Sequence, residues 1–189
     1  MTTFAPTLYA RSFPRSNARL RDFILIFGGA ILVALFAQIK ILLPFSPVPI
    51  TGQTFATLLI GATLGSKRGA LSMMLYIALG TFGLPVFAGG ASGMAYLTGA
   101  TMGYLVGFVV SAYIIGKMAE RGFERNLRTS LLPFLVGTFV IYLFGAGWLA
   151  TLVGMEKALA LGVSPFLVGD LIKLMLAALA LPTAWKILR

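Results

Sequence analysis

The sequence contains no histidine and no cysteine, and only five of its 189 residues are acidic. Imidazole bases, thiol nucleophiles, Cys/His zinc sites and disulfides are therefore excluded. Two of the carboxylates, Glu120 and Glu124, alternate with basic residues in the stretch 117–128, which we expect to be solvated and salt-bridged. Because no carboxylate pair remains for hydrolysis, we expect a protein that is not an enzyme and that uses no metal or cofactor.

A phosphate-binding loop is also missing. Residues 61–67 superficially resemble one, but a Walker motif needs a wider spacing between its glycines, followed by Gly-Lys-Ser/Thr. Any ATP hydrolysis linked to this protein must therefore take place on another subunit.

Charged residues are scarce and apolar residues are abundant. They make up 11% and 59% of the chain, whereas a soluble domain is about a quarter charged. The apolar runs are continuous and lack the period-two alternation of a membrane β-barrel. No long linker or fixed-period repeat divides the chain. We therefore expect a single all-α integral membrane domain over residues 1–189.

Six apolar stretches are predicted to cross the membrane as α-helices. The second and third are shorter than the roughly 17 residues of a simple span, so we expect tilting, shielding by neighbouring helices or extension into the preceding loop. A tight, basic turn at residues 65–68 separates these two. The predicted spans are residues 23–43, 54–65, 69–84, 96–116, 131–153 and 166–185.

The net charge of +10 follows the membrane and does not indicate nucleic acid binding. If six spans alternate, twelve of the fifteen basic residues fall on one side and the opposite loops carry only Lys157. The positive-inside rule then places both termini in the cytoplasm, with residues 1–22 as a tail. The twelve are Arg11, Arg15, Arg19, Arg21, Lys67, Arg68, Lys117, Arg121, Arg125, Arg128, Lys186 and Arg189.

Asp170 and Lys173 are opposite charges one helical turn apart inside the last apolar stretch. Ionised groups in hydrocarbon are costly, so they persist there by pairing and facing a cavity, and they usually serve a ligand or an ion. Their spacing places both on one helix face. The pair indicates a buried binding site, and the alternative interpretation is a salt bridge that only holds helices together.

Two loops expected on the outer side contain candidate binding groups. Residues 44–53 include three prolines and form a stiff, non-helical lid or an ordinary turn, with Thr51 and Gln53 near the mouth. Residues 80–93 contain five glycines and one proline, which argue against a helix and offer backbone N–H groups. Aromatic residues there form either an apolar wall or interfacial anchors: Phe82, Phe87 and Tyr96.

Small residues recur at helical spacing in two of the predicted spans. The row Gly99, Gly103 and Gly107 is expected to pack internally. The pair Ala30 and Ala34 fits either internal packing or a docking face for another membrane protein.

Taken together, these segments resemble the BioY family, the biotin-specific S components of energy-coupling-factor (ECF) transporters. Four motifs occur in the family's order over nearly the whole chain, and residues 30–34 match the Ala-xxx-Ala docking motif. The four are Pro-Val-Pro-Ile-Thr-Gly-Gln-Thr-Phe at 47–55, Gly-Leu-Pro-Val-Phe-Ala-Gly-Gly at 83–90, the glycine row after Tyr96, and Gly-Asp-Leu-Ile-Lys at 169–173.

The resemblance implies an S-component-like bundle of six helices in a prokaryotic cell membrane. Such a protein captures external biotin and releases it inward together with a transmembrane coupling subunit and two ATPases. Asp170 and Lys173 would match the ureido ring, and Ala30 and Ala34 would contact the coupling subunit. Secondary candidates for biotin contact are Thr51, Gln53, Tyr96, Phe87 and the backbone amides of Gly89 and Gly90.

Other interpretations remain open at this point. The same architecture would suit an S component for another small vitamin, or a membrane assembly protein in which the Asp/Lys pair is purely structural. An intramembrane enzyme is disfavoured because no catalytic group is visible. Lys40, in an apolar segment, has no assigned role.

Overall fold

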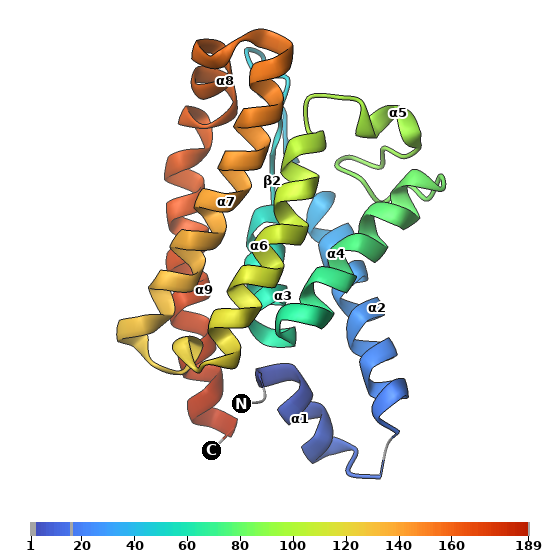
Figure 1. The fold of residues 1–189 in the computed structure, drawn as a ribbon, viewed down its shortest axis with the longest axis vertical. Helices are drawn as coiled ribbons and strands as arrows, with labels where there is room; N and C mark the ends of the chain where they lie inside the picture. Colours follow the sequence, from blue (N-terminus) through green and yellow to red (C-terminus); the bar gives the residue numbers. More distant parts are fainter. Residues whose placement is uncertain (1–2, 16, 189) are drawn as a thin grey trace.

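The computed structural model describes residues 3–15 and 17–188 (Figure 1). Arg189, one of the twelve cations assigned to the cytoplasmic side, lies outside the described residues. The elements are α1 (Phe4–Ser12), α2 (Ala18–Ala37), β1 (Lys40–Ile41), β2 (Ile50–Thr51), α3 (Gln53–Leu64), α4 (Ser66–Thr81), α5 (Met94–Leu97), α6 (Met102–Glu120), η1 (Phe123–Arg125), α7 (Leu127–Val153), α8 (Met155–Gly162), η2 (Ser164–Phe166) and α9 (Leu167–Leu188).

The chain is an all-helical membrane protein apart from one short hairpin. Four described stretches are long and apolar enough to cross a membrane: Ala18–Ala37, Met102–Glu120, Leu127–Val153 and Met155–Ile187. The other two predicted spans correspond to α3 and α4, which have only 12 and 16 residues.

Two predicted boundaries are wrong because the loops take other structures. The first helix ends at Ala37, since Lys40 and Ile41 pair antiparallel with Thr51 and Ile50. The fourth predicted span begins within α5, and α6 starts only at Met102 after a turn. Gly80 and Thr81 belong to the last turn of α4, and residues 82–93 contain no helix, as expected.

Helix α3 occupies the centre of the bundle. It contacts α1, α2, α4, α6, α7 and α9, and most of its residues are buried. Neighbouring helices therefore surround this short helix, which is one of the three arrangements expected for it. The turn into α4 is formed by Gly65 with φ +85°, and Gly116 of α6 packs so closely that an added Cβ would clash with the Ser66 backbone. The two glycines bring α3, α4 and α6 into backbone contact.

The glycine row joins α6 to α7. A Cβ on Gly103 would collide with the Phe144 carbonyl oxygen, and one on Gly107 would lie 3.0 Å from the Ile141 Cα. Gly99 lies in the turn before α6, where its carbonyl accepts a 3.0 Å hydrogen bond from the indole of Trp148. Internal packing, the expected role of this row, is confirmed for Gly103 and Gly107.

The alanine pair on α2 is divided between the core and its edge. Ala30 is fully buried on the α2 face that also carries Val33 and Ala37, and α2 packs against α3 and α4. Ala34 is only partly buried. Ala30 therefore packs internally in this structure, and Ala34 alone of the pair offers accessible surface.

The acidic residues near the α6–α7 connection behave differently from one another. Glu120 accepts hydrogen bonds from the backbone N–H and the hydroxyl of Ser66 at 2.8 and 2.7 Å, which caps α4. Glu124 is 0% exposed, because η1 packs against α9. The expectation of a solvated segment is therefore wrong for Glu124, although its carboxylate lies 3.6 Å from Arg125 Nε.

Charge is segregated between the two ends of the bundle. The hairpin, the connection between α4 and α5, and α8 lie at one end; the N-terminal segment, the α3–α4 turn, the α6–α7 connection and the end of α9 lie at the other (Figure 1). The described cations that the sequence analysis assigned to one side all belong to the second group of segments.

Candidate functional site

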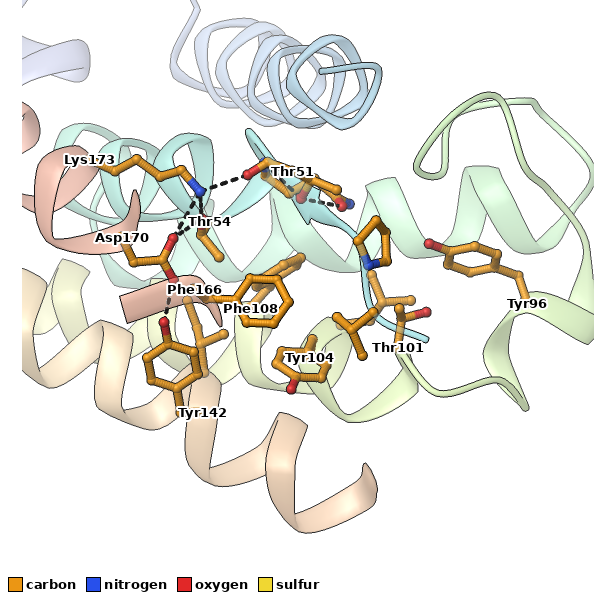
Figure 2. A pocket seen from close by; sticks show the side chains of 15 residues that line it. Thr51, Thr54, Tyr96, Thr101, Tyr104, Phe108, Tyr142, Phe166, Asp170 and Lys173 are labelled. Atoms are coloured by element: carbon orange, nitrogen blue, oxygen red, sulfur yellow. Dashed lines mark hydrogen bonds and ion pairs between the residues drawn. The ribbon is translucent and has the colours of Figure 1, made fainter. Parts of the chain in front are cut away.

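A pocket lies among the hairpin, α3, α6, α7 and α9 (Figure 2). It contains Asp170 and Lys173 and several of the polar groups expected near them. The lining residues are Val48, Pro49, Thr51, Gln53, Thr54, Tyr96, Thr101, Tyr104, Leu105, Phe108, Ile141, Tyr142, Phe166, Asp170 and Lys173.

Lys173 links α9 to the hairpin and to α3. Its Nζ donates to Asp170 Oδ1 at 2.8 Å, as the spacing of the two residues predicts. The same Nζ donates to the Thr51 carbonyl oxygen at 2.8 Å and to Thr54 Oγ1 at 3.0 Å. An ammonium with three acceptors in this geometry is fully coordinated, because it has only three N–H donors.

Asp170 accepts hydrogen bonds on both of its carboxylate oxygens. Tyr142 donates its hydroxyl hydrogen to Oδ2 at 2.6 Å, and Thr54 donates to Oδ1 at 3.2 Å. Asp170 is only 5% exposed. Burying a charge in this way is tolerable because it is paired and hydrogen-bonded on both oxygens. Asp170, Lys173, Thr51, Thr54 and Tyr142 are called the polar cluster below.

Gln53 and Thr51 connect the pocket to the glycine-rich loop of residues 82–93. Thr51 donates to Gln53 Oε1 at 3.0 Å, and Gln53 Nε2 donates to the Tyr76 hydroxyl at 2.7 Å. The Tyr76 ring meets Phe87 edge-on with centroids 5.6 Å apart, and Phe87 stacks on Tyr96 at 4.4 Å. A continuous set of contacts therefore runs from the hairpin, at Thr51, to the pocket-lining ring of Tyr96.

Three predicted residues of the glycine-rich loop lie outside the pocket lining. Phe87 is fully buried, over Gly80 of α4. The Gly89 amide donates to the Ala37 carbonyl at 3.4 Å and the Gly90 amide to the Phe87 carbonyl at 3.0 Å. The loop folds back onto α2 and α4, so its amides bond within the chain and do not face the pocket.

Aromatic rings fill the space between the polar cluster and Tyr96. In Figure 2 the rings of Phe166 and Phe108 lie between these two ends, with Tyr104 beside them. Tyr104 directs its hydroxyl away to the Gly162 carbonyl at 2.6 Å. The pocket therefore combines one strongly polar end with apolar walls, as is usual for small-molecule sites.

The cavity is narrow in this structure. Its volume is about 40 Å³, enough for a few water molecules, whereas small-molecule sites enclose roughly 300–1,000 Å³. A ligand therefore requires movement of the walls. The hairpin wall is secured by Lys173 and by Ser46, whose hydroxyl donates to the Leu161 carbonyl at 2.7 Å.

Several lining residues are not apparent from the sequence. Tyr142 gives a faint signal, because a tyrosine hydroxyl within an apolar span needs a partner. Thr54 follows the predicted Thr51 and Gln53, but the sequence predicts it only as the first residue of a span. Phe108 and Phe166 resemble aromatic residues that face lipid. Lys40 lies outside the lining, with its Nζ 3.5 Å from the Ala88 carbonyl oxygen.

Comparison with known proteins gives consistent matches. The BioY family model matches residues 10–189. A protein named probable biotin transporter BioY from Pyrococcus horikoshii is 44% identical over 147 residues, covering 75% of this chain and 86% of its own. The biotin transporter BioY of Thermotoga maritima is 39% identical over 155 residues, covering 82% of this chain and 88% of its own.

The fold is also similar to a solved structure. A crystal structure of the S-component for biotin from an ECF-type ABC transporter superposes with a TM-score of 0.78. The two are 25% identical, and the match covers 90% of this chain and 94% of the other. With a family match over nearly its whole length, the chain belongs to the BioY family.

Proposed function

We propose that this chain is the biotin-binding S component of an ECF-type ABC transporter. The names of its relatives and of the similar crystal structure support this function. The observation that carries it is the polar cluster at one end of an aromatic pocket within the bundle. ATP hydrolysis belongs to separate ATPase subunits, because this chain has no phosphate-binding loop.

Biotin's shape suits the two ends of the pocket. Its ureido ring carries two N–H donors and one carbonyl acceptor, which an aspartate acceptor and a lysine donor complement. Its thioether ring and valeryl chain require apolar walls such as those of Phe108, Phe166 and Tyr96. A site whose buried polar groups are paired by one ligand strongly rejects ligands that leave them unpaired. We therefore assign specificity to Asp170 and Lys173.

Binding must exchange hydrogen bonds at the polar cluster. All three N–H donors of Lys173 are already used within the chain, so biotin can accept from Lys173 only by replacing one of its present partners. Asp170 Oδ2 accepts from Tyr142 and can accept one further hydrogen bond. The partners that biotin would replace are the Thr51 carbonyl, in the hairpin, and the Thr54 hydroxyl, in the first turn of α3. Gln53 positions Thr51 through the 3.0 Å hydrogen bond between their side chains.

We infer that residues 1–189 form one transmembrane domain with six spans and both termini in the cytoplasm. The segregation of cations to one end of the bundle supports this orientation. Helices α3 and α4 would be the two short crossings, and the burial of α3 among six other helices reduces its contact with lipid.

Docking on the coupling subunit is proposed for the accessible side of α2 that includes Ala34. Exposed apolar residues continue this surface at Ile31 and Leu35. Ala30 supports it from within, because its small side chain lets α2 approach α3 and α4 closely.

One observation favours an alternative function. The polar cluster satisfies Asp170 and Lys173 without any ligand, as expected of a structural ion pair in an assembly protein. An S component for another vitamin would also keep this architecture. Labelled biotin and other labelled vitamins, added to the purified protein, separate the three. Tight, stoichiometric binding of biotin supports the proposal, binding of another vitamin alone replaces it, and binding of neither favours the structural role.

A further inference from the structure

A second hollow lies far from the pocket, where the α6–α7 connection meets the last turns of α9. Figure 1 places these two segments together at the basic end of the bundle. The hollow has a volume of about 450 Å³, within the range of small-molecule sites. Three of its lining residues are cations, namely Arg125, Arg128 and Lys186, and none is acidic.

The charges in this hollow are largely uncompensated. Arg128 and Lys186 are exposed and make no ion pair with any residue in the ranges 3–15 and 17–188. Arg125 is the exception, since the carboxylate of the fully buried Glu124 of η1 lies 3.6 Å from its Nε. The hollow is therefore electropositive and suits an anion with several acceptor oxygens.

The walls of the hollow are held in place by packing. The Arg125 guanidinium lies over the Trp185 ring, 4.5 Å from its centroid. Phe4 of α1 packs edge-on against the same ring at 5.5 Å. One turn into α7, Ser130 is fully buried and donates a 2.9 Å hydrogen bond to the Ala178 carbonyl of α9. These contacts fix the start of α7 against α9, so the cationic side chains project from a rigid base.

Apolar surface extends from the hollow along the outside of α7. Leu127 lines the hollow, and Leu131 and Leu135 follow at helical spacing on the same face; the three are 51%, 39% and 46% exposed. Leu179, three residues before the lining residue Pro182, is similarly exposed on α9. A free phosphate ion makes no use of this surface, whereas an acyl chain attached to a phosphate does.

We propose that this hollow binds the head group of an anionic phospholipid, with its phosphate among Arg125, Arg128 and Lys186 and its acyl chains along Leu127, Leu131 and Leu135. Basic residues beside a membrane span attract the head groups of anionic lipids. The site is separate from the biotin pocket and does not depend on the proposed transport function.

The test compares lipid binding to the detergent-purified full chain by native mass spectrometry. The probes are phosphatidylglycerol and the zwitterionic phosphatidylcholine. The double variant Arg128→Gln/Lys186→Gln removes two cations from the hollow. The control Lys67→Gln/Arg121→Gln removes two exposed cations from the same end of the bundle but outside the hollow. Melting temperatures without added lipid identify any variant that fails to fold.

The wild-type chain and the control should retain phosphatidylglycerol in preference to phosphatidylcholine. The hollow variant should bind phosphatidylglycerol at least about tenfold more weakly, as expected for two lost cations. Equal weakening in the control would overturn the site, because the attraction would then come from the general charge of this end. Binding of inorganic phosphate that competes fully with phosphatidylglycerol at equal concentration would overturn the assignment to a lipid.

Discussion

The hydroxyl of Tyr142 donates a 2.6 Å hydrogen bond to Asp170 Oδ2, on the side of the carboxylate opposite Lys173. This contact joins α7 to α9 inside the bundle and fixes the orientation of the aspartate. Oδ1 accepts from Lys173 and Thr54, whereas Oδ2 accepts from Tyr142 and keeps room for one more donor. The orientation of the aspartate is therefore set before any ligand arrives, which reduces the side-chain entropy lost on binding.

Tyr142→Phe should lower biotin affinity by about tenfold. The variant keeps the ring in place but removes a hydrogen bond to a charged group, which contributes about 1.5–3 kcal/mol. Equilibrium binding to the purified variant measures the effect. Tyr113→Phe is the matched control, because Tyr113 is an exposed tyrosine of α6 outside the pocket lining. An equal loss in the control would show that the effect does not come from the polar cluster.

Asp170→Asn distinguishes a ligand contact from a structural ion pair. The amide keeps the shape of the carboxyl group but loses its charge, so affinity should fall about ten- to a hundredfold if Asp170 accepts hydrogen bonds from biotin. Asp22→Asn is the control, since Asp22 pairs with Arg21 and Arg68 away from the pocket. Normal affinity with a lowered ligand-free melting temperature would instead assign the pair to the scaffold.

Ser46→Ala should loosen the hairpin over the pocket. The substitution removes the 2.7 Å hydrogen bond to Leu161 of α8, and a neutral hydrogen bond contributes about 0.5–1.5 kcal/mol. Biotin should therefore dissociate about two- to tenfold faster in a chase with unlabelled ligand. Ser164→Ala deletes a comparable hydroxyl bonded to Leu159 in the same region, and its dissociation rate should stay at the wild-type value. An unchanged rate for Ser46→Ala would mean that the hairpin does not control exit.

Reporter fusions test the proposed orientation. Fusions after Arg128 and after Arg189 should report a cytoplasmic location, because the cations segregate to the corresponding end. A fusion after Lys157 should report the opposite side. An external signal at either of the first two positions contradicts the six-span topology.

Glu124→Gln should change how stability depends on pH. Burial raises the pKa of the Glu124 carboxyl above its ordinary value of 4.5. Between the pKa of 4.5 in the unfolded chain and the higher pKa in the folded protein, the folded protein binds more protons than the unfolded chain. The free energy of unfolding therefore falls as pH rises through this window and levels off above it. The glutamine does not titrate, so the variant should lose this component of the decline.

Melting curves recorded from about pH 4 to about pH 9 compare the two proteins. The difference in melting temperature between variant and wild type should grow in favour of the variant as pH rises. A difference that is constant with pH would mean that Glu124 has the same proton affinity in the folded and unfolded chain.

The sequence predicts the charged part of the site better than its apolar part. Asp170 and Lys173 are identifiable because a charged group in hydrocarbon is costly and usually serves a ligand or an ion. Phe108 and Phe166 are not, because an aromatic residue in a span looks the same whether it faces lipid or a ligand. The positions of Gly89 and Gly90 depend on how the glycine-rich loop folds back on α2, and local composition carries no information about that contact.

The same distinction applies to the fold. The longer spans are predictable because length and apolarity alone suffice to place them. The end of α2 at Ala37 and the start of α6 at Met102 depend on a strand pairing and on a turn bonded to Trp148. The sequence does not decide whether Ala30 and Ala34 pack internally or dock a partner, because small residues permit both. The arrangement of α3 and α4 around α2 decides it for Ala30.

The central position of the 12-residue helix α3 also bears on how the protein is made. A segment this short, with Gln53 and Thr57 buried along it, has no stable place in lipid by itself. Its main contacts with α6 arise only after about fifty further residues have been synthesised, at the elongation rate of about 5–20 residues per second. Until α6 has been made, α3 lacks the helix that it contacts most, so we expect α3 to reach its final position only after α6 has been inserted.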